Sequence, residues 1–183
     1  AGVPDVGENK VQEAIGKQDQ VAARARVRMA DVRWHLIGHL QTNKVKTLDR
    51  FSLFHALDRA RLADAVDRVG RTAAPIDVLV QVNVSGEDTE GGYVPEELPA
   101  EADRLVQLSG LRVVGVMTMA PFDAEEEMLR RVFGGARAAR AVLRAAGHPA
   151  TELSMGMSGD FEVAVEEGAT LVRLGTVLFG ERG

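Results

Sequence analysis

Two segments near the C-terminal end of the sequence combine glycine with hydroxyl side chains, as phosphate-binding loops do. Residues 153–162 read LSMGMSGDFE and residues 173–180 read RLGTVLFG. A glycine lets an anion approach backbone N–H groups, and a Ser or Thr hydroxyl adds a further donor. Taken alone, Ser158 could cap a helix and Gly175 could serve only a turn. If the two segments are adjacent in the fold, together they could enclose one phosphate dianion.

Other polar residues have spacings that admit both a structural and a ligand-binding interpretation. Asn9 has Gln12 three residues further on, the pattern of a capping box, and contact with a ligand is compatible with that role. His35 lies in a β-branched and apolar run, where a single histidine is more often a hydrogen-bonded core residue than a catalyst. Gln81 and Asn83 alternate with valines, so both amides face one side of a strand, which we expect to be the barrel interior, and they could serve as structural hydrogen-bond partners.

Several classes of function lack the residues that they need. The 4 histidines form no ligand-spaced cluster and no HExxH occurs, so no metal site is expected. Neither a Walker loop nor a GxGxxG fingerprint is present, which disfavours nucleotide cofactors. The net charge is -5 with no basic block, so nucleic acid is not an expected partner. The absence of Cys, of a signal peptide and of a bilayer-length apolar run indicates a cytoplasmic protein without a membrane association.

The segments that position these residues alternate between short β-branched runs and amphipathic helices. Helices are predicted at residues 9–29, 59–71 and 125–146, where apolar residues recur at helical spacing. Alternation of this kind predicts a parallel sheet. The seven candidate strands are 4–8, 33–37, 51–57, 76–84, 111–118, 151–154 and 169–174.

The predicted fold class is α/β, a parallel (β/α)8 TIM-type barrel that lacks its first β-strand. A doubly wound sheet is the alternative, but the sequence begins in the middle of a βα unit, and 183 residues is short of the roughly 250 of a typical barrel. We therefore expect a single barrel domain over residues 1–183, with the first βα unit upstream of Ala1. Working groups would lie at the carboxyl ends of the strands. Residues 85–93 predict a mobile loop, more often a plain connection than a lid.

Several motifs along the chain match a known pattern. They are VGENKVQE at 6–13, WHLIGHLQTNK at 34–44, QVNV at 81–84, MGMSGD at 155–160 and the run at 173–180. Together they resemble the pyridoxal phosphate homeostasis protein family. The resemblance covers nearly the whole chain in order, and it implies the barrel that this family shares with the N-terminal domain of alanine racemase.

The resemblance implies pyridoxal 5'-phosphate (PLP) as the cofactor. By it, the cofactor phosphate would be held by Ser158, Gly159, Gly175 and Thr176, while Arg173 would meet the pyridine nitrogen. Because an arginine is permanently protonated, it would donate to this nitrogen and keep it unprotonated. The ring would then be a weaker electron sink than one paired with aspartate, which would restrain carbanion chemistry.

The same resemblance assigns the surroundings of the cofactor ring. Asn9, His35 and Met157 would line them, and Met119 occupies the position where the racemase pattern has a ring-stacking histidine. The family's Schiff-base lysine would lie at the end of the first barrel strand, upstream of Ala1. No catalytic residue is therefore assigned within the sequence.

The expected function is PLP binding for intracellular PLP homeostasis, as a carrier or buffer without catalytic turnover. PLP-dependent apoenzymes would be its recipients, and we expect a monomer because no exposed apolar stripe is evident. One alternative is a fold-type-III amino-acid racemase, which would need acid/base groups on both ring faces, commonly including a tyrosine. The only tyrosine, Tyr93, falls in the predicted loop. A barrel that binds another phosphorylated metabolite is the other alternative, because phosphate loops do not identify what the phosphate is attached to.

Overall fold

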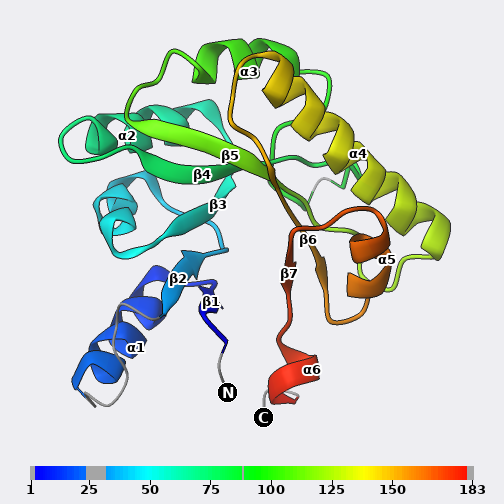
Figure 1. Cartoon of the computed structure of the whole chain (residues 1–183), viewed down its shortest axis with the longest axis horizontal. Helices are drawn as coiled ribbons and strands as arrows, with labels where there is room; N and C mark the ends of the chain where they lie inside the picture. The colour runs from blue at the N-terminus through cyan, green and yellow to red at the C-terminus, as the bar shows by residue number, and fades with distance from the viewer. Residues whose placement is uncertain (1–2, 24–31, 88, 181–183) are drawn as a thin grey trace.

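The computed structural model describes residues 3–23, 32–87 and 89–180, and its centre is one parallel β-sheet. The 7 strands pair in sequence order, and every neighbouring pair is parallel. The sheet curves into a nearly closed barrel, with β1 and β7 at its two edges (Figure 1). The strands are β1 Asp5–Glu8, β2 Arg33–Leu36, β3 Leu53–Leu57, β4 Ile76–Gln81, β5 Leu111–Met117, β6 Glu152–Met157 and β7 Leu171–Arg173.

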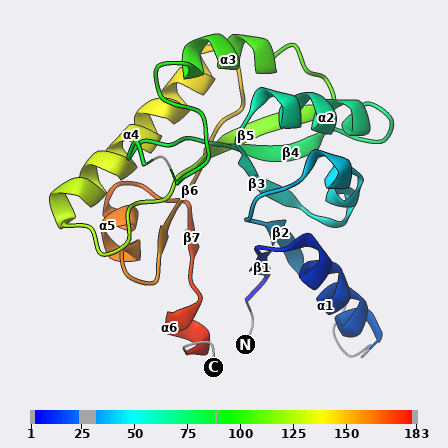
Figure 2. The ribbon, with the colours of Figure 1, turned by 180° about the vertical axis from the view of Figure 1, so that it is seen from behind.

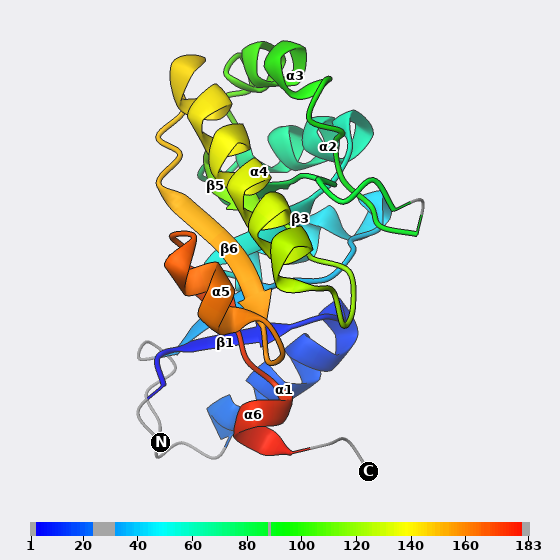
Figure 3. The same cartoon turned by 90° about the vertical axis from the view of Figure 1, so that its right-hand side faces the viewer.

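Helices lie outside the curved sheet, one after nearly every strand, as the views from front and back show (Figure 1, Figure 2). The longest of them, α4, runs alongside β6 and contacts β5 as well (Figure 3). A 3-10 helix at Thr42–Arg50 connects β2 to β3. The α-helices are α1 Val11–Ala23, α2 Ala60–Gly70, α3 Leu98–Leu105, α4 Glu126–Ala145, α5 Phe161–Glu166 and α6 Thr176–Phe179.

The predicted fold class, a TIM-type barrel, is confirmed, and each of the candidate strands overlaps an observed strand. Their ends differ by more than two residues in two places. β4 ends at Gln81, three residues before the predicted end, because Val82 pairs only in an isolated bridge with Tyr93 as the chain enters a loop. β6 continues to Met157 rather than ending at 154. The predicted helix at 9–29 is observed as α1, and its residues from 24 onward lie outside the described part of the chain.

The core lies on both sides of the central strands, as expected for a parallel sheet that is covered on both faces. All five residues of β3 are buried, without the alternation of a half-exposed strand. The predicted apolar face of α4 supplies much of the outer layer, and each of its members is buried: Leu129, Val132, Phe133, Ala136 and Leu143.

One expectation about the surface is wrong. No exposed apolar stripe was expected, but α6 exposes three consecutive apolar side chains. Their exposed fractions are 58% for Val177, 56% for Leu178 and 85% for Phe179. This short helix follows β7, the last strand of the sheet, so the apolar surface lies at one edge of the barrel (Figure 1).

A glycine near the end of β6 fixes the turn into α5. Gly156 has φ +92, a backbone conformation that other residues adopt only with strain. A Cβ atom at this position would also come within 2.6 Å of the Cβ of Ala164 on α5. The missing side chain therefore lets α5 pack directly on the strand, and this places the loop between them at the carboxyl end of β6.

Candidate functional site

The loops after β6 and β7 lie side by side because their strands are paired neighbours. The backbone N–H groups of Gly175 and Val177 both point at Ser158 Oγ, at N···O distances of 3.3 Å and 3.4 Å. Both hydrogen bonds are long and exposed to solvent. Two backbone donors therefore converge on one oxygen atom at the start of α6, an arrangement that a phosphate oxygen could also satisfy.

Open space lies in front of the two loop glycines. A Cβ atom built on Gly159 or on Gly175 would have no neighbouring atom within 4 Å. Asp160 shapes the first loop, since its Oδ1 accepts a hydrogen bond from Met157 N over 2.5 Å and turns the chain back on itself. Thr176 is exposed at the start of α6. Converging backbone donors beside open space are the arrangement that an anion such as phosphate requires.

Arg173, the last residue of β7, is held by three hydrogen bonds. Its Nη1 donates to the carbonyl and to the hydroxyl of Ser154, each at 2.8 Å, and its Nη2 donates to the carbonyl of Thr118 at 3.0 Å. A guanidinium has five N–H groups. The Nε–H and one Nη2–H of Arg173 thus donate to no group in the described part of the chain.

The Arg173 guanidinium is a half-buried cation with acidic residues nearby. Burial lowers the pKa of Arg173 to about 10, while the charges of Asp160 and Glu90 oppose the shift. A pKa in this range still leaves the guanidinium charged at neutral pH, in keeping with the general behaviour of arginine. The side chain is therefore a fixed cationic donor two residues before the Gly175 loop.

A row of hydrogen bonds crosses the barrel interior and ends at Arg173. His55 Nδ1 lies 2.9 Å from Ser154 Oγ, and His55 Nε2 lies 2.9 Å from His35 Nδ1. His35 Nε2 lies 3.2 Å from Asp5 Oδ1. Because β3 and β6 are not neighbours in the sheet, the bond from His55 to Ser154 must span the lumen. We call Asp5, His35, His55, Ser154 and Arg173 the cross-barrel chain.

Both histidines of the cross-barrel chain are buried, with exposed fractions of 9% for His35 and 2% for His55. Desolvation lowers the pKa of His35, opposed in part by the negative charge of Asp5. Desolvation also lowers the pKa of His55 well below its usual value, and the neighbouring His35 and the cation Arg173 add to the effect. The two imidazoles are therefore neutral at neutral pH.

The sequence did not indicate His55 or Ser154 as members of a site. His55 stood out only as one of four histidines without metal spacing, and Ser154 ended a predicted strand. Both strands were predicted, so the alternation of side chains could have shown on which face of the sheet each residue lies. It could not have shown that the two residues meet, because they are 99 residues apart in the sequence and lie on opposite sides of a curved sheet.

The remaining predicted site residues lie at other strand ends. Asn9 is exposed immediately after β1, and Met119 is half-buried, packed against the core two residues after β5. Met157 ends β6 and is half-buried. The structure thus brings Ser158 and Gly175 into direct contact and links His35 to Arg173 through the cross-barrel chain.

The amides of Gln81 and Asn83 hold the loop at 85–93 in place. Gln81 Nε2 donates to the carbonyl of Gly91 at 2.8 Å. Asn83 Nδ2 donates to the carbonyls of Glu87 at 2.9 Å and Glu90 at 3.1 Å. These hydrogen bonds confirm the interpretation of both amides as structural partners. Three side-chain hydrogen bonds thus hold the backbone of the loop, as they would in a plain connection.

Tyr93, at the end of the same loop, is buried with an exposed fraction of 6%. Its hydroxyl donates to Glu101 Oε1 over 2.8 Å. Desolvation and this carboxylate raise the pKa of Tyr93 far above the ordinary value of a phenol. The hydroxyl thus serves to join the loop to α3, and it is a poor proton donor or acceptor at neutral pH.

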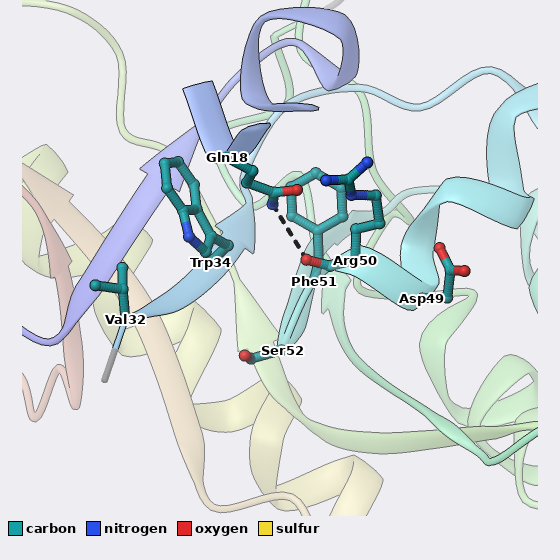
Figure 4. Close-up of a pocket in the computed structure, with 7 residues that line it drawn as sticks. All are labelled: Gln18, Val32, Trp34, Asp49, Arg50, Phe51 and Ser52. Atoms are coloured by element: carbon teal, nitrogen blue, oxygen red, sulfur yellow. Dashed lines mark hydrogen bonds between the residues drawn. The ribbon is translucent and has the colours of Figure 1, made fainter. Parts of the chain in front are cut away.

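A cavity of about 320 Å³ lies away from these strand ends, between α1, the start of β2 and the 3-10 helix (Figure 4). Gln18 crosses it to donate from Nε2 to the carbonyl of Arg50 at 3.1 Å. The indole Nε1 of Trp34 is the one buried side-chain nitrogen or oxygen in the described residues that has no hydrogen-bond partner. Trp34 and Ser52 place this cavity at the amino ends of their strands, opposite the end at which barrel sites form.

The described residues contain no group of three or more His, Cys, Asp or Glu side chains that could hold a metal ion. Among the helices in the described ranges, none combines the length and the apolar character that crossing a bilayer requires.

Comparisons with known proteins agree on one family. The profile of the family "Alanine racemase, N-terminal domain" matches residues 1–183. The pyridoxal phosphate homeostasis protein of Aquifex aeolicus is 45% identical over 184 residues, which is 99% of this chain and 78% of that protein. The protein of the same name from Escherichia coli K12 is 34% identical over 184 residues, covering 100% of this chain and 77% of the relative.

Solved structures give the same result. PipY of Synechococcus elongatus PCC7942, determined with PLP bound, superposes with a TM-score of 0.84 at 37% identity, covering 95% of this chain and 80% of PipY. Alanine racemase from Corynebacterium glutamicum gives a TM-score of 0.75 at 17% identity over 96% of this chain and 47% of the racemase. At that identity the racemase shares the fold alone.

Proposed function

This chain belongs to the pyridoxal phosphate homeostasis protein family, within the wider alanine racemase N-terminal domain family, and we propose that it binds PLP at the carboxyl ends of its strands. The main support is the meeting of the loops after β6 and β7, where two backbone N–H groups converge on Ser158 Oγ beside the charged side chain of Arg173. The PLP-bound structure of PipY, at 37% identity, is consistent with this proposal.

In the proposed complex the phosphate replaces Ser158 Oγ as the acceptor for the N–H groups of the β7 loop, while the Ser158 and Thr176 hydroxyls donate to it. Gly159 and Gly175 leave the room that the phosphate needs. These contacts combine backbone donors with the start of a helix, the usual composition of an anion site.

Arg173 would donate to the pyridine nitrogen from its Nε–H or from the Nη2–H that donates to no protein group. When bound, the cofactor supplies an aldehyde and an electron-withdrawing ring for reactions with amines. A permanently charged donor keeps the ring nitrogen unprotonated and so weakens that ring as an electron sink. Asn9, His35, Met119 and Met157 would line the rest of the ring's surroundings.

The proposed activity is that of a PLP carrier or buffer without catalytic turnover. The relatives carry the name of homeostasis proteins, which fits this role. The burial of Tyr93 and its bond to Glu101 support it further, because the only tyrosine of the sequence is unsuited to shuttle protons at a cofactor. We also propose a cytoplasmic location and PLP-dependent apoenzymes as recipients. The absence of Cys fits a reducing compartment.

We further propose that residues 1–183 form a single barrel domain and that the protein is monomeric. Light scattering coupled to size-exclusion chromatography tests the second point. A mass of twice 19.7 kDa for this chain would contradict it. The apolar surface of α6 would then be the first place to look for the contact, and Phe179→Ser would be the first variant to measure.

Equilibrium dialysis tests PLP binding most directly. We expect PLP to bind more tightly than pyridoxal, which lacks the phosphate, and more tightly than glycerol 3-phosphate, which lacks the ring. Equal binding of glycerol 3-phosphate and PLP would favour another phosphorylated metabolite as the ligand. Exchange of the α-proton of alanine for deuterium in the presence of PLP would contradict the proposal of no turnover, and no exchange is the expected result.

A further inference from the structure

The cross-barrel chain has one direction in which all of its hydrogen bonds are satisfied with neutral imidazoles. A guanidinium is only a donor and an ionised carboxylate only an acceptor, so Arg173 must donate at one end of the cross-barrel chain and Asp5 must accept at the other. Ser154 Oγ accepts from Arg173 and keeps its own hydrogen for the acceptor nearby, His55 Nδ1. His55 must then carry its hydrogen on Nε2, from which it donates to His35 Nδ1. His35 in turn donates from Nε2 to Asp5.

The cross-barrel chain also determines how the guanidinium of Arg173 is oriented. Both hydrogens of its Nη1 are engaged by Ser154, one by the carbonyl and one by the hydroxyl. Together with the bond from Nη2 to Thr118, these contacts fix the plane of the guanidinium. Without the hydroxyl acceptor, one Nη1–H would lose its partner inside a buried site, and the guanidinium could rotate to find another.

The geometry points to Ser154 and His55 as positioning residues for Arg173. His55 holds the Ser154 hydroxyl so that its oxygen lone pairs face Arg173, and Ser154 then holds the guanidinium with its remaining N–H groups available to a pyridine nitrogen. The inference rests on the proposed function, because it concerns the part of the site that would meet the cofactor ring. Neither residue needs to touch the cofactor.

Two small ligands separate this role from a general structural one. Pyridoxine 5'-phosphate has the phosphate and the ring nitrogen but no aldehyde, so its affinity depends only on non-covalent contacts. Benzyl phosphate has a ring and a phosphate but no ring nitrogen. Since hydrogen bonds to charged groups are stronger than neutral ones, Ser154→Ala should lower the affinity for pyridoxine 5'-phosphate about tenfold and leave that for benzyl phosphate within about twofold.

Variants of His55 test the next link and remain informative if Ser154→Ala does not fold. His55→Asn keeps an acceptor close to the Nδ1 position, so it should retain most of the preference for pyridoxine 5'-phosphate, whereas His55→Phe should lose it as Ser154→Ala does. His148 provides the matched control, because it is also buried and, from the loop after α4, its Nε2 bonds to the carbonyl of Ala102 on α3 at 2.9 Å. His148→Asn should leave the ratio of the two affinities unchanged.

The outcomes distinguish this inference from the function on which it rests. If the wild-type protein binds neither ligand, the proposed PLP site itself is wrong. If it binds pyridoxine 5'-phosphate and the Ser154 and His55 variants either match it or lose both ligands equally, the positioning role alone is wrong. The tautomers give a second measurement on the wild-type protein. Nitrogen NMR should show His35 and His55 protonated at Nε2, and a proton on His55 Nδ1 would overturn the inference.

Discussion

The backbone N–H of Gly175 lies 3.3 Å from Ser158 Oγ, and this contact joins the loop after β7 to the loop after β6. The donor is the N-cap residue of α6, and the acceptor is a neutral hydroxyl in a solvent-exposed hydrogen bond. A phosphate oxygen carries more negative charge than a hydroxyl and accepts stronger hydrogen bonds. The contact is therefore weak enough for a phosphate to displace.

The space in front of Gly175 gives the first prediction. Gly175→Leu should leave the free energy of unfolding within about 0.5 kcal/mol of wild type, because a Cβ there meets no atom within 4 Å and surface substitutions away from special features cost little. The same side chain should occupy the phosphate position and lower PLP affinity at least about tenfold. Dialysis with PLP and urea titration measure the two quantities.

Gly16→Leu is the control for this substitution, since Gly16 is exposed on α1 and its Cβ would likewise have no neighbour within 4 Å. This variant should leave PLP affinity unchanged and raise the free energy of unfolding by about 0.5–1 kcal/mol, because glycine is unfavourable inside a helix. Unchanged PLP binding in Gly175→Leu would place the phosphate elsewhere.

Arg173 should be far less tolerant of replacement by lysine than an arginine at the surface. An ammonium lacks the planar fork that reaches both Ser154 and Thr118, so Arg173→Lys should leave buried acceptors unsatisfied and lower the free energy of unfolding by about 1–3 kcal/mol. Arg112 pairs with Asp77 at 2.6 Å in a more exposed position. Arg112→Lys should therefore cost less than about 1 kcal/mol. Equal losses in urea titration would show that the acceptors of Arg173 contribute little.

Gly156 and Gly168 provide a pair of positions that separates steric contact from backbone strain. Both glycines have φ +92, so each substitution to Ala incurs the cost of a left-handed conformation, about 1–2 kcal/mol. Only at Gly156 would the new Cβ also meet Ala164 at 2.6 Å. Gly156→Ala should consequently destabilise the protein by about 1–3 kcal/mol more than Gly168→Ala. Similar urea midpoints for the two variants would mean that α5 shifts without cost.

The strands and the two glycine-containing loops after β6 and β7 could be predicted from the sequence because both depend on local chemistry. β-branched runs of the right length predicted each strand, and the spacing of glycine and hydroxyl residues predicted both loops. Adjacency of Ser158 and Gly175 followed once consecutive strands were taken as neighbours. The 3-10 helix at Thr42–Arg50 was missed because its nine residues contain few apolar positions, and only Val45 and Leu48 are buried.

The cross-barrel chain could not be predicted in the same way. Its bond between His55 and Ser154 depends on how far the sheet curves, which brings β3 opposite β6 across the lumen. A strand pattern gives the face on which a side chain lies, but not the residue that it meets on a strand three places away. For the same reason Gln81 and Asn83, whose common face was predicted, could not be assigned to the loop carbonyls that they bind.

The last prediction concerns pH and the buried histidines. The pKa of His55 is well below 6.5 in the folded protein, whereas the unfolded chain titrates near that value. Between the two pKa values the unfolded state binds the additional proton, so stability falls as pH decreases below about 6.5, by about 1.4 kcal/mol per pH unit for one such group. The pKa of His35 is lowered as well, so His55→Asn should reduce this slope in urea titrations between about pH 7.5 and pH 5 and leave the part that His35 contributes. The pKa of Asp5 is lowered from 3.8, so its contribution is lost only at lower pH and does not overlap this window. A slope that is unchanged in His55→Asn would show that the proton is taken up elsewhere.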